Sequence, residues 1–193
     1  RTDPEAMEAV RNADLVLADG IGIIYGAKLL GTPLKGRVTG IGFAQGLMGE
    51  MAQNGKSLFL LGAKPGVAEK AADKLRAAYP GLQIAGTRDG YFQEDGPVLE
   101  EIRASGADVA FVCLGAPKQE KWMRKNGAAS GARLLVGLGG CLDVFSGEVQ
   151  RAPEIFQRLG LEWFYRLVKN PSRIGRMMKL PLFLLHTAGE RRP

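Results

Sequence analysis

The stretch "DVAFVCLGAPKQEKW" (108–122) runs from a continuous apolar segment through a short turn into a charged segment that starts at a proline. Similar apolar runs occur at 14–19, 57–63, 82–92 and 133–140, and helix-like segments separate several of them. Continuous apolar runs predict strands that are buried on both faces. We therefore expect an α/β, Rossmann-like fold with a mainly parallel sheet and helices on both faces.

The C-terminal part has a different pattern, because no strand signal follows the last of these runs. Residues 153–170 predict one helix, and residues 171–180 predict a second, with Pro171 in its first turn and Pro181 at its end. A segment of this length is too short to bury a core of its own. We expect residues 151–193 to form a helical appendage.

Charge divides the chain in the same place. The net charge is +6, and residues 151–193 hold nine Lys and Arg against three Asp and Glu. Residues 1–150, which we expect to form the core domain, hold 17 of each kind. An excess of positive charge confined to one end predicts an anionic partner there.

The composition limits the classes of protein and of chemistry. Hydrophobic residues make up 46% of the chain and charged residues 24%, as in a globular protein. Of the two cysteines, Cys113 lies in an apolar run, where we expect a buried thiol and no disulfide framework. His186 is the single histidine, which argues against a His-rich metal site and against a Ser-His-Asp triad. Acid–base chemistry would therefore fall to a carboxylate.

Asp19 is the first candidate for such a carboxylate. It follows an apolar run, and ligands of parallel sheets bind beyond the carboxyl ends of the strands. The residues leave two interpretations open, since Asp19 could take part in the chemistry or could cap the helix that follows. The segment "LADGIGIIYG" (17–26) also resembles a dinucleotide fingerprint, but its glycines are spaced one residue too far apart. Nicotinamide binding is therefore the weaker alternative.

Three turns supply candidate ligand-binding residues. "GRVTG" (36–40) holds Arg37 and Thr39, and an arginine there either binds a phosphate or stays solvated. In "LGAPKQEKW" (114–122) a helix starts at the proline, and its first N–H groups favour an anion. The alternative there is an exposed polar helix start. The glycines of "VGLGG" (136–140) allow close approach of a ligand to the backbone.

The appendage has three possible interpretations. Its aromatic and aliphatic residues could complete a core with a solvated basic side, or the segment could bind nucleic acid, or it could lie on an anionic membrane. The nucleic-acid alternative lacks a recognisable binding motif. No apolar window approaches the ~18 residues of a membrane span.

Several segments together resemble one family, the WecG/TagA/CpsF glycosyltransferases of bacterial surface-polymer synthesis. They occur in the family's order and are "ADLVLADGIGIIYGAKLLG", "RVTG", "RDGYF", "LGAPKQEKW", "VGLGGCLDVFSGEVQRAP" and "LGLEWFYRL…NPSRIGRM". The resemblance implies an inverting transferase that moves an N-acetylmannosamine-type sugar from a UDP donor to polyprenyl-diphosphate-linked GlcNAc. It also implies that a further family segment, containing Thr-x-Asn, belongs ahead of Arg1.

The resemblance also implies residue roles. Asp19 matches the proposed base, and Arg37 and Gln119 match donor-site residues. The C-terminal arginines that are thought to close over the site at the membrane match Arg166, Arg173 and Arg176. With the turn residues above, the predicted substrate-binding set is Arg37, Thr39, Gly40, Gly115, Pro117, Lys118, Gln119, Glu120, Gly139 and Gly140.

The expected partners follow from the same resemblance. They are a UDP-sugar, an undecaprenyl-diphosphate-GlcNAc acceptor and the cytoplasmic face of the bacterial cell membrane, with no metal, no cofactor and no nucleic acid. A homo-oligomer is compatible with the sequence. The alternatives are a non-catalytic nucleotide- or lipid-binding module and, less favoured, an NAD-dependent oxidoreductase.

Overall fold

The computed structural model describes residues 3–169, 171, 174–177 and 179–189. The chain divides into two compact units. Unit 1 comprises Arg1–Val16 and Gly40–Gln150, and unit 2 comprises Leu17–Thr39 and Arg151–Pro193. Residues 17–39 thus cluster with the C-terminal segment. The predicted division at residue 150 stays a prediction.

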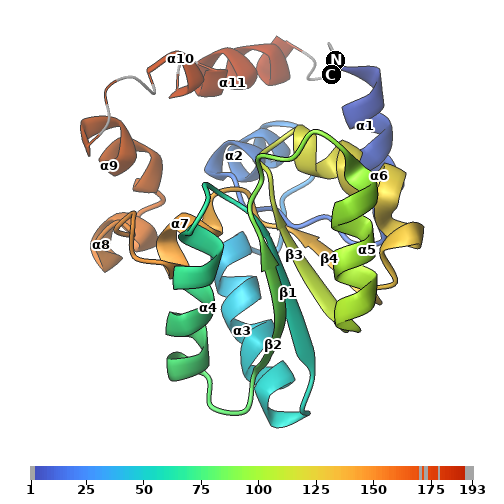
Figure 1. The fold of residues 1–193 in the computed structure, drawn as a ribbon. Helices are drawn as coiled ribbons and strands as arrows, with labels where there is room; N and C mark the ends of the chain where they lie inside the picture. The colour runs from blue at the N-terminus through green and yellow to red at the C-terminus, as the bar shows by residue number, and fades with distance from the viewer. Residues whose placement is uncertain (1–2, 170, 172–173, 178, 190–193) are drawn as a thin grey trace. The chain divides into compact units, whose positions relative to one another are not determined.

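Unit 1 is built around a four-stranded parallel sheet with the strand order β2-β1-β3-β4 (Figure 1). Its strands are β1 (Ser57–Gly62), β2 (Gln83–Arg88), β3 (Val109–Cys113) and β4 (Leu134–Gly137). Its helices are α1 (Pro4–Arg11), α3 (Gly40–Gln53), α4 (Val67–Ala78), α5 (Asp95–Ser105), α6 (Lys118–Ser130) and α7 (Cys141–Phe145). The predicted α/β, Rossmann-like architecture is confirmed.

The two central strands are apolar from Leu58 and from Val109 onward because both faces of the sheet are covered. On one face, Leu58 and Phe111 pack with Met48 of α3 and residues of α4 and α7. On the other face, Phe59 and Val112 pack with residues of α5 and α6. β1 and β3 pair from Leu58 opposite Val109 to Gly62 opposite Cys113. This register brings the carboxyl ends of the central strands to the same edge, as parallel pairing requires.

The expected strand at 14–19 is wrong. This segment has no ladder hydrogen bonds, and Leu15 and Val16 are exposed. A backbone hydrogen bond from Val38 N to Ala18 O at 3.1 Å links it to the segment around Arg37, but the two segments form no β-ladder. A strand needs a neighbouring strand to satisfy its N–H and C=O groups, and an apolar sequence alone does not supply one.

The regular secondary structure that is described in unit 2 is helical. Its helices are α2 (Ile21–Leu29), α8 (Glu154–Arg158), α9 (Glu162–Lys169), α10 (Ile174–Met177) and α11 (Lys179–Gly189). Helix α11 packs on α2. The packing is close at Gly26, where an added Cβ would lie 2.9 Å from Cε1 of Phe183.

Two predicted features of these C-terminal helices are wrong. The helix expected at 153–170 is broken into α8 and α9, because Gly160 lies between them in the left-handed region at φ +70°. The second helix does not end at Pro181. That residue is the third of α11, and the first turn of a helix tolerates proline because its N–H groups need no intrahelical acceptor.

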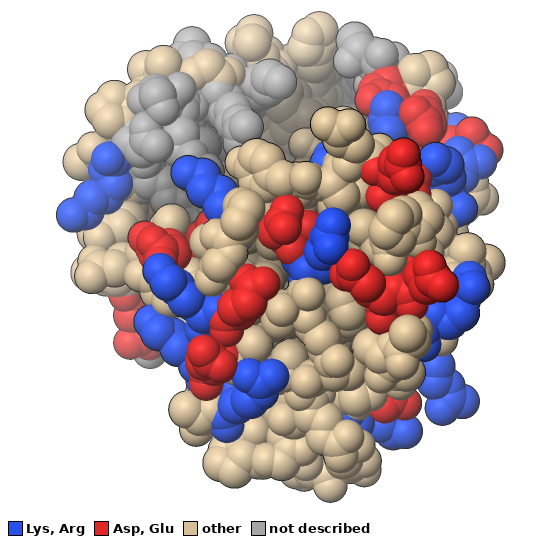
Figure 2. Space-filling view, viewed as in Figure 1, with Lys and Arg blue, Asp and Glu red and all other residues tan. Residues whose placement is uncertain are grey.

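Surface charges of both signs mix on the face drawn in Figure 2. Unit 1 contains short ion pairs such as Lys70–Glu148 at 2.6 Å and Lys125–Asp95 at 2.8 Å. This mixing agrees with the balanced charge of residues 1–150.

Candidate functional site

The loops that follow the strands of unit 1 are tied together at the carboxyl edge of the sheet. Gly62 ends β1 at φ +130°, and a Cβ there would lie 2.4 Å from the carbonyl oxygen of Cys113. Leu138 N, after β4, donates to Val112 O at 3.0 Å. The predicted residues from Gly115 to Glu120 and at Gly139 and Gly140 therefore share one edge.

Gln119 is the best-held polar residue of this edge. It is buried, and its Oε1 accepts a hydrogen bond from the backbone N of Gly139 at 2.8 Å. Its Nε2 donates to Oε1 of Glu120 at 2.9 Å. The side chain fits beside β4 because Gly137 has no Cβ, which would lie 2.9 Å from Nε2. Gln119 thus fixes the glycine turn after β4.

Glu120 and Lys118 flank Gln119 in the first turn of α6. Oε2 of Glu120 is buried and has no hydrogen-bond partner among the described residues. Lys118 Nζ lies 3.3 Å from Gly90 O and 5.1 Å from the centre of the Phe92 ring. Lys118 therefore links the helix start to the loop after β2. Together the two side chains put one charge of each sign at the start of α6.

The backbone ahead of α6 has the conformations that its sequence predicts. Gly115 adopts φ +78°, and Pro117 occupies the N-cap position of α6. Gly139 adopts φ +54°, and Gly140 is the N-cap of α7. Glycine-rich turns of this kind allow a ligand to approach the backbone closely.

A hydrogen-bond network anchors α6 to α5. Trp122 Nε1 donates to Oδ1 of Asp95 at 2.9 Å, and Lys125 Nζ donates to Oδ2 at 2.8 Å. The hydrogen bond from Lys125, partly opposed by burial, lowers the pKa of Asp95 below its ordinary value. The helix start that holds Gln119 is thus fixed from its second turn as well.

Unit 2 brings together Asp19 and Arg37. Arg37 Nε donates to the backbone oxygen of Asp19 at 2.6 Å, and its Nη2 lies 3.4 Å from Oδ1. The side chain of Asp19 keeps 52% of its surface exposed. The structure shows that the two residues are in contact. Their roles in a site stay a prediction.

The capping alternative for Asp19 is wrong, because Gly20 is the N-cap residue of α2. The dinucleotide alternative is wrong too, since the fingerprint requires a strand ahead of its first glycine and residues 14–19 form none. Gly26 serves the packing of α11 on α2.

Glu162 is a charged residue of unit 2 that sequence reasoning missed. Its Oε2 accepts a hydrogen bond from Arg37 Nη2 at 2.8 Å, and its Oε1 lies 3.6 Å from Arg151 Nε. The residue is 9% exposed. The sequence carried one signal, a lone acid in the aromatic and apolar segment "LGLEWFY" of a basic appendage.

The structure gives the positions of most of the remaining predicted residues, and their roles stay predictions. Thr39 immediately precedes α3, and Gly40 is its first residue. Arg166 lies in α9 and Arg176 in α10, while Arg173 falls outside the described residues. Helices α9 and α10 are separate, as the predicted interruption at Pro171 implies.

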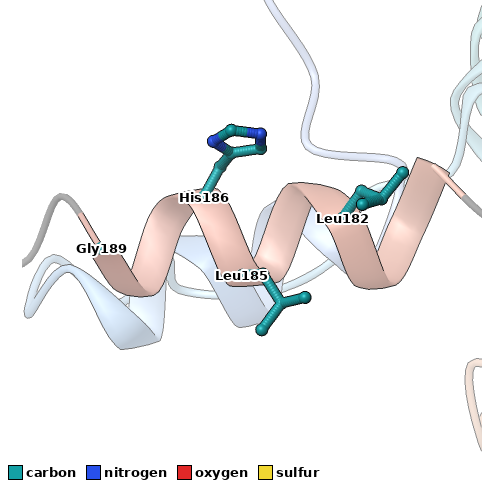
Figure 3. A pocket seen from close by; sticks show the side chains of 4 residues that line it. All are labelled: Leu182, Leu185, His186 and Gly189. Carbon is teal, nitrogen blue, oxygen red and sulfur yellow. The ribbon is translucent and has the colours of Figure 1, made fainter.

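Helix α11 lines an open surface cavity of about 470 Å³ with Leu182, Leu185, His186 and Gly189 (Figure 3). Leu182 and Leu185 are exposed. Over the described residues, no helix is long and apolar enough to cross a membrane. Within the same part of the chain, His, Cys, Asp and Glu side chains form no group of three or more that could hold a metal ion.

The parallel sheet with polar turns at its carboxyl edge defines an α/β protein, and ligands of such sheets bind at that edge. A family model described as "Glycosyl transferase WecG/TagA/CpsF family" matches residues 1–193. This chain belongs to the WecG/TagA/CpsF family of glycosyl transferases.

Two curated relatives are similar over most of the chain. One, from Bacillus spizizenii, is 39% identical over 182 residues, which are 94% of this chain and 71% of the relative. The other, from Bacillus subtilis, is 38% identical over 183 residues, 95% of this chain and 72% of the relative. Both are named N-acetylglucosaminyldiphosphoundecaprenol N-acetyl-beta-D-mannosaminyltransferase.

Proposed function

We propose that this protein is an inverting transferase that moves N-acetylmannosamine, or a related sugar, from a UDP donor to polyprenyl-diphosphate-linked GlcNAc. The family membership and the names of both relatives support the reaction class and the acceptor. The observation that carries the proposal is the half-exposed carboxylate of Asp19, which Arg37 holds through the Asp19 backbone oxygen at 2.6 Å. A held but accessible carboxylate is what the deprotonation of a sugar hydroxyl requires.

In the proposed reaction, Asp19 takes the proton from the acceptor hydroxyl. The hydroxyl oxygen forms a bond to the anomeric carbon of the donor, while the bond from that carbon to the diphosphate oxygen breaks. UDP leaves with the bonding electron pair, and the proton stays on Asp19. Attack opposite to the leaving group inverts the anomeric centre.

The donor diphosphate develops charge as the bond breaks, and cations and helix N-termini stabilise such charge. We assign this task to Arg166, Arg173 and Arg176. Donor contacts are assigned to Arg37, Thr39 and Gly40 and to the edge residues of unit 1, which are Gly115, Pro117, Lys118, Gln119, Glu120, Gly139 and Gly140. Gln119 is buried and bonds to Gly139, which supports a contribution to donor binding through the shape of the glycine turn.

The proposal includes peripheral binding to the cytoplasmic face of the cell membrane, where the lipid-linked acceptor resides. The exposed apolar side chains of the appendage support it, with Val168 64% and Leu185 71% exposed. So does the excess of Lys and Arg in residues 151–193. Apolar groups that insert beside cations bind anionic lipid surfaces.

The test is a screen of UDP-sugars with a short-chain polyprenyl-diphosphate-GlcNAc acceptor, with UDP release as the readout. We expect release that depends on the acceptor and is fastest with UDP-N-acetylmannosamine. UDP binding without turnover on any lipid-linked acceptor would instead support a non-catalytic binding module.

A further inference from the structure

Four charged side chains of unit 2 form a row of ion pairs, in the order Asp19, Arg37, Glu162 and Arg151. Arg37 is at its centre, because its Nη2 lies 2.8 Å from Oε2 of Glu162 and 3.4 Å from Oδ1 of Asp19. Arg151 Nε lies 3.6 Å from the other carboxylate oxygen of Glu162. These four side chains carry two negative and two positive charges.

Burial of these four side chains is greatest at Glu162, and Arg151 beyond it is 26% exposed. The side chain of Asp19 is 52% exposed, that of Arg37 22% and that of Glu162 11%. A carboxylate that leaves water loses solvation, so a buried one needs a well-placed cation in return. Arg37 supplies that cation to Glu162, and the shorter distance shows that Arg37 is held more firmly by Glu162 than by the Asp19 carboxylate.

A second contact fixes the same alignment. Gly160, two residues before Glu162, is buried against Ile21, two residues after Asp19. A Cβ on Gly160 would lie 3.0 Å from Cδ1 of Ile21. The start of α9 and the segment at Asp19 therefore meet twice, once through apolar packing and once through the Arg37 bridge.

The geometry points to Glu162 as a positioning residue for the transfer reaction. Glu162 holds the Arg37 guanidinium in the orientation that lets Nε bond to the Asp19 backbone oxygen, and so sets the location of the Asp19 carboxylate. Glu162 touches neither substrate in this scheme. The inference rests on the proposed function in one respect, the role of Asp19 as the base.

A small displacement of a base has a large effect on rate. Displacing a reacting group by about 1 Å lowers the rate on the order of 10²-fold. Glu162→Gln keeps the size of the side chain and an acceptor oxygen but removes the charge that holds Arg37. We expect kcat to fall roughly 10- to 100-fold, with the KM for UDP-N-acetylmannosamine changed less than about threefold. The matched control is Glu100→Gln in α5, the same substitution at an exposed position of unit 1, which should leave kcat near the parent value.

Coupling to Asp19 separates positioning from a general structural role. The Asp19→Asn variant has no base left to position. In that background, Glu162→Gln should lower kcat further by less than about threefold. If Glu162→Gln lowers kcat by the same factor with and without Asp19, or leaves kcat unchanged in the parent, the inference is wrong. If Asp19→Asn itself keeps normal turnover, the proposed base is wrong, which is a different failure.

A second variant covers the case in which Glu162→Gln does not fold. Arg37→Lys keeps the charge next to Glu162 but loses the planar fork that bonds to both residues. We expect kcat to fall over the same range in a protein whose thermal unfolding is close to that of the parent. Full kcat in Arg37→Lys would overturn the inference, because the bridge would then be dispensable.

Discussion

The buried amide of Gln119 accepts a hydrogen bond from the backbone N–H of Gly139, with 2.8 Å between Oε1 and N. This bond ties the first turn of α6 to the turn after β4. It depends on Gly137, whose missing Cβ leaves room for both Gln119 and Met123. One side chain and one glycine therefore fix the turn after β4 at the carboxyl edge of the sheet.

The first prediction concerns this fit. Gly137→Ala places a Cβ 2.8 Å from Cε of Met123 and 2.9 Å from Nε2 of Gln119, so both side chains are crowded and we expect Gln119 to move. We expect a loss of about 1–3 kcal/mol in the free energy of unfolding and weaker binding of UDP. Calorimetric titration with UDP and denaturant unfolding measure the two effects. Gly127→Ala is the control, because its Cβ would make an ordinary 3.6 Å contact with Leu135. An unchanged UDP affinity in Gly137→Ala would contradict a role for this turn in donor binding.

The second prediction concerns pH and Asp95. Because the pKa of Asp95 is lowered in the folded protein, its charged form stabilises the fold above the unfolded pKa of about 3.9, and this contribution is lost as the pH falls through the lower folded value. Asp95→Asn should therefore be less stable than the parent at neutral pH, with a difference that shrinks in acid.

Unfolding in denaturant at a series of pH values measures this difference. Asp73→Asn is the control, since the Asp73 side chain is 78% exposed and pairs with Arg76 within one helix. Such surface pairs contribute about 0–1 kcal/mol. A pH-independent gap between the parent and Asp95→Asn would show that the charge of Asp95 does not stabilise the fold.

The third prediction concerns the packing of α11 on α2. Gly26→Val should push Phe183 away and loosen α11, because a Cβ at Gly26 already comes within 2.9 Å of the ring. Hydrogen exchange of residues 179–189 should become faster. Gly46→Val in α3 introduces the same side chain where nothing lies within 4 Å of the Cβ, and should leave that exchange unchanged. Equal exchange in both variants would rule out a packing role for Gly26.

The fourth prediction concerns the C-terminal arginines. Replacing Arg166, Arg173 and Arg176 together by Ala should lower transfer by about 10²-fold or more, since preorganised cations stabilise the departing diphosphate. Binding to anionic phospholipid vesicles should also weaken. The control removes three cations of α4 and its preceding turn, Lys64, Lys70 and Arg76. A similar loss of transfer in the control would mean that total charge matters and not these three positions.

Much of the fold could be predicted because burial on both faces of a sheet leaves an uninterrupted apolar run. The runs at 57–63 and 108–116 are β1 and β3, the central strands. The run at 14–19 misled because an apolar sequence does not reveal whether a partner strand is present. The break at Gly160 and the continuation through Pro181 depend on local backbone geometry, which the periodicity of apolar residues does not report.

Part of the candidate site was proposed from the sequence. Asp19 was chosen because it follows the apolar run at 14–19, which is not a strand, and Gln119 was chosen from its place after the run at 108–116 and from the family resemblance. Glu162 was missed because its importance lies in a contact with Arg37, 125 residues away in sequence, and a single sequence gives no sign of such a pair. The roles of Asp19 and Gln119 in the reaction stay predictions.

The most direct test of the account is the turnover of Asp19→Asn with UDP-N-acetylmannosamine and a short-chain polyprenyl-diphosphate-GlcNAc, measured beside UDP binding by the same preparation. The account predicts a loss of about 10²- to 10⁴-fold in kcat with UDP affinity retained, because only the proton acceptor is removed. Turnover near that of the parent, with unchanged binding, would contradict the assignment of Asp19 as the base.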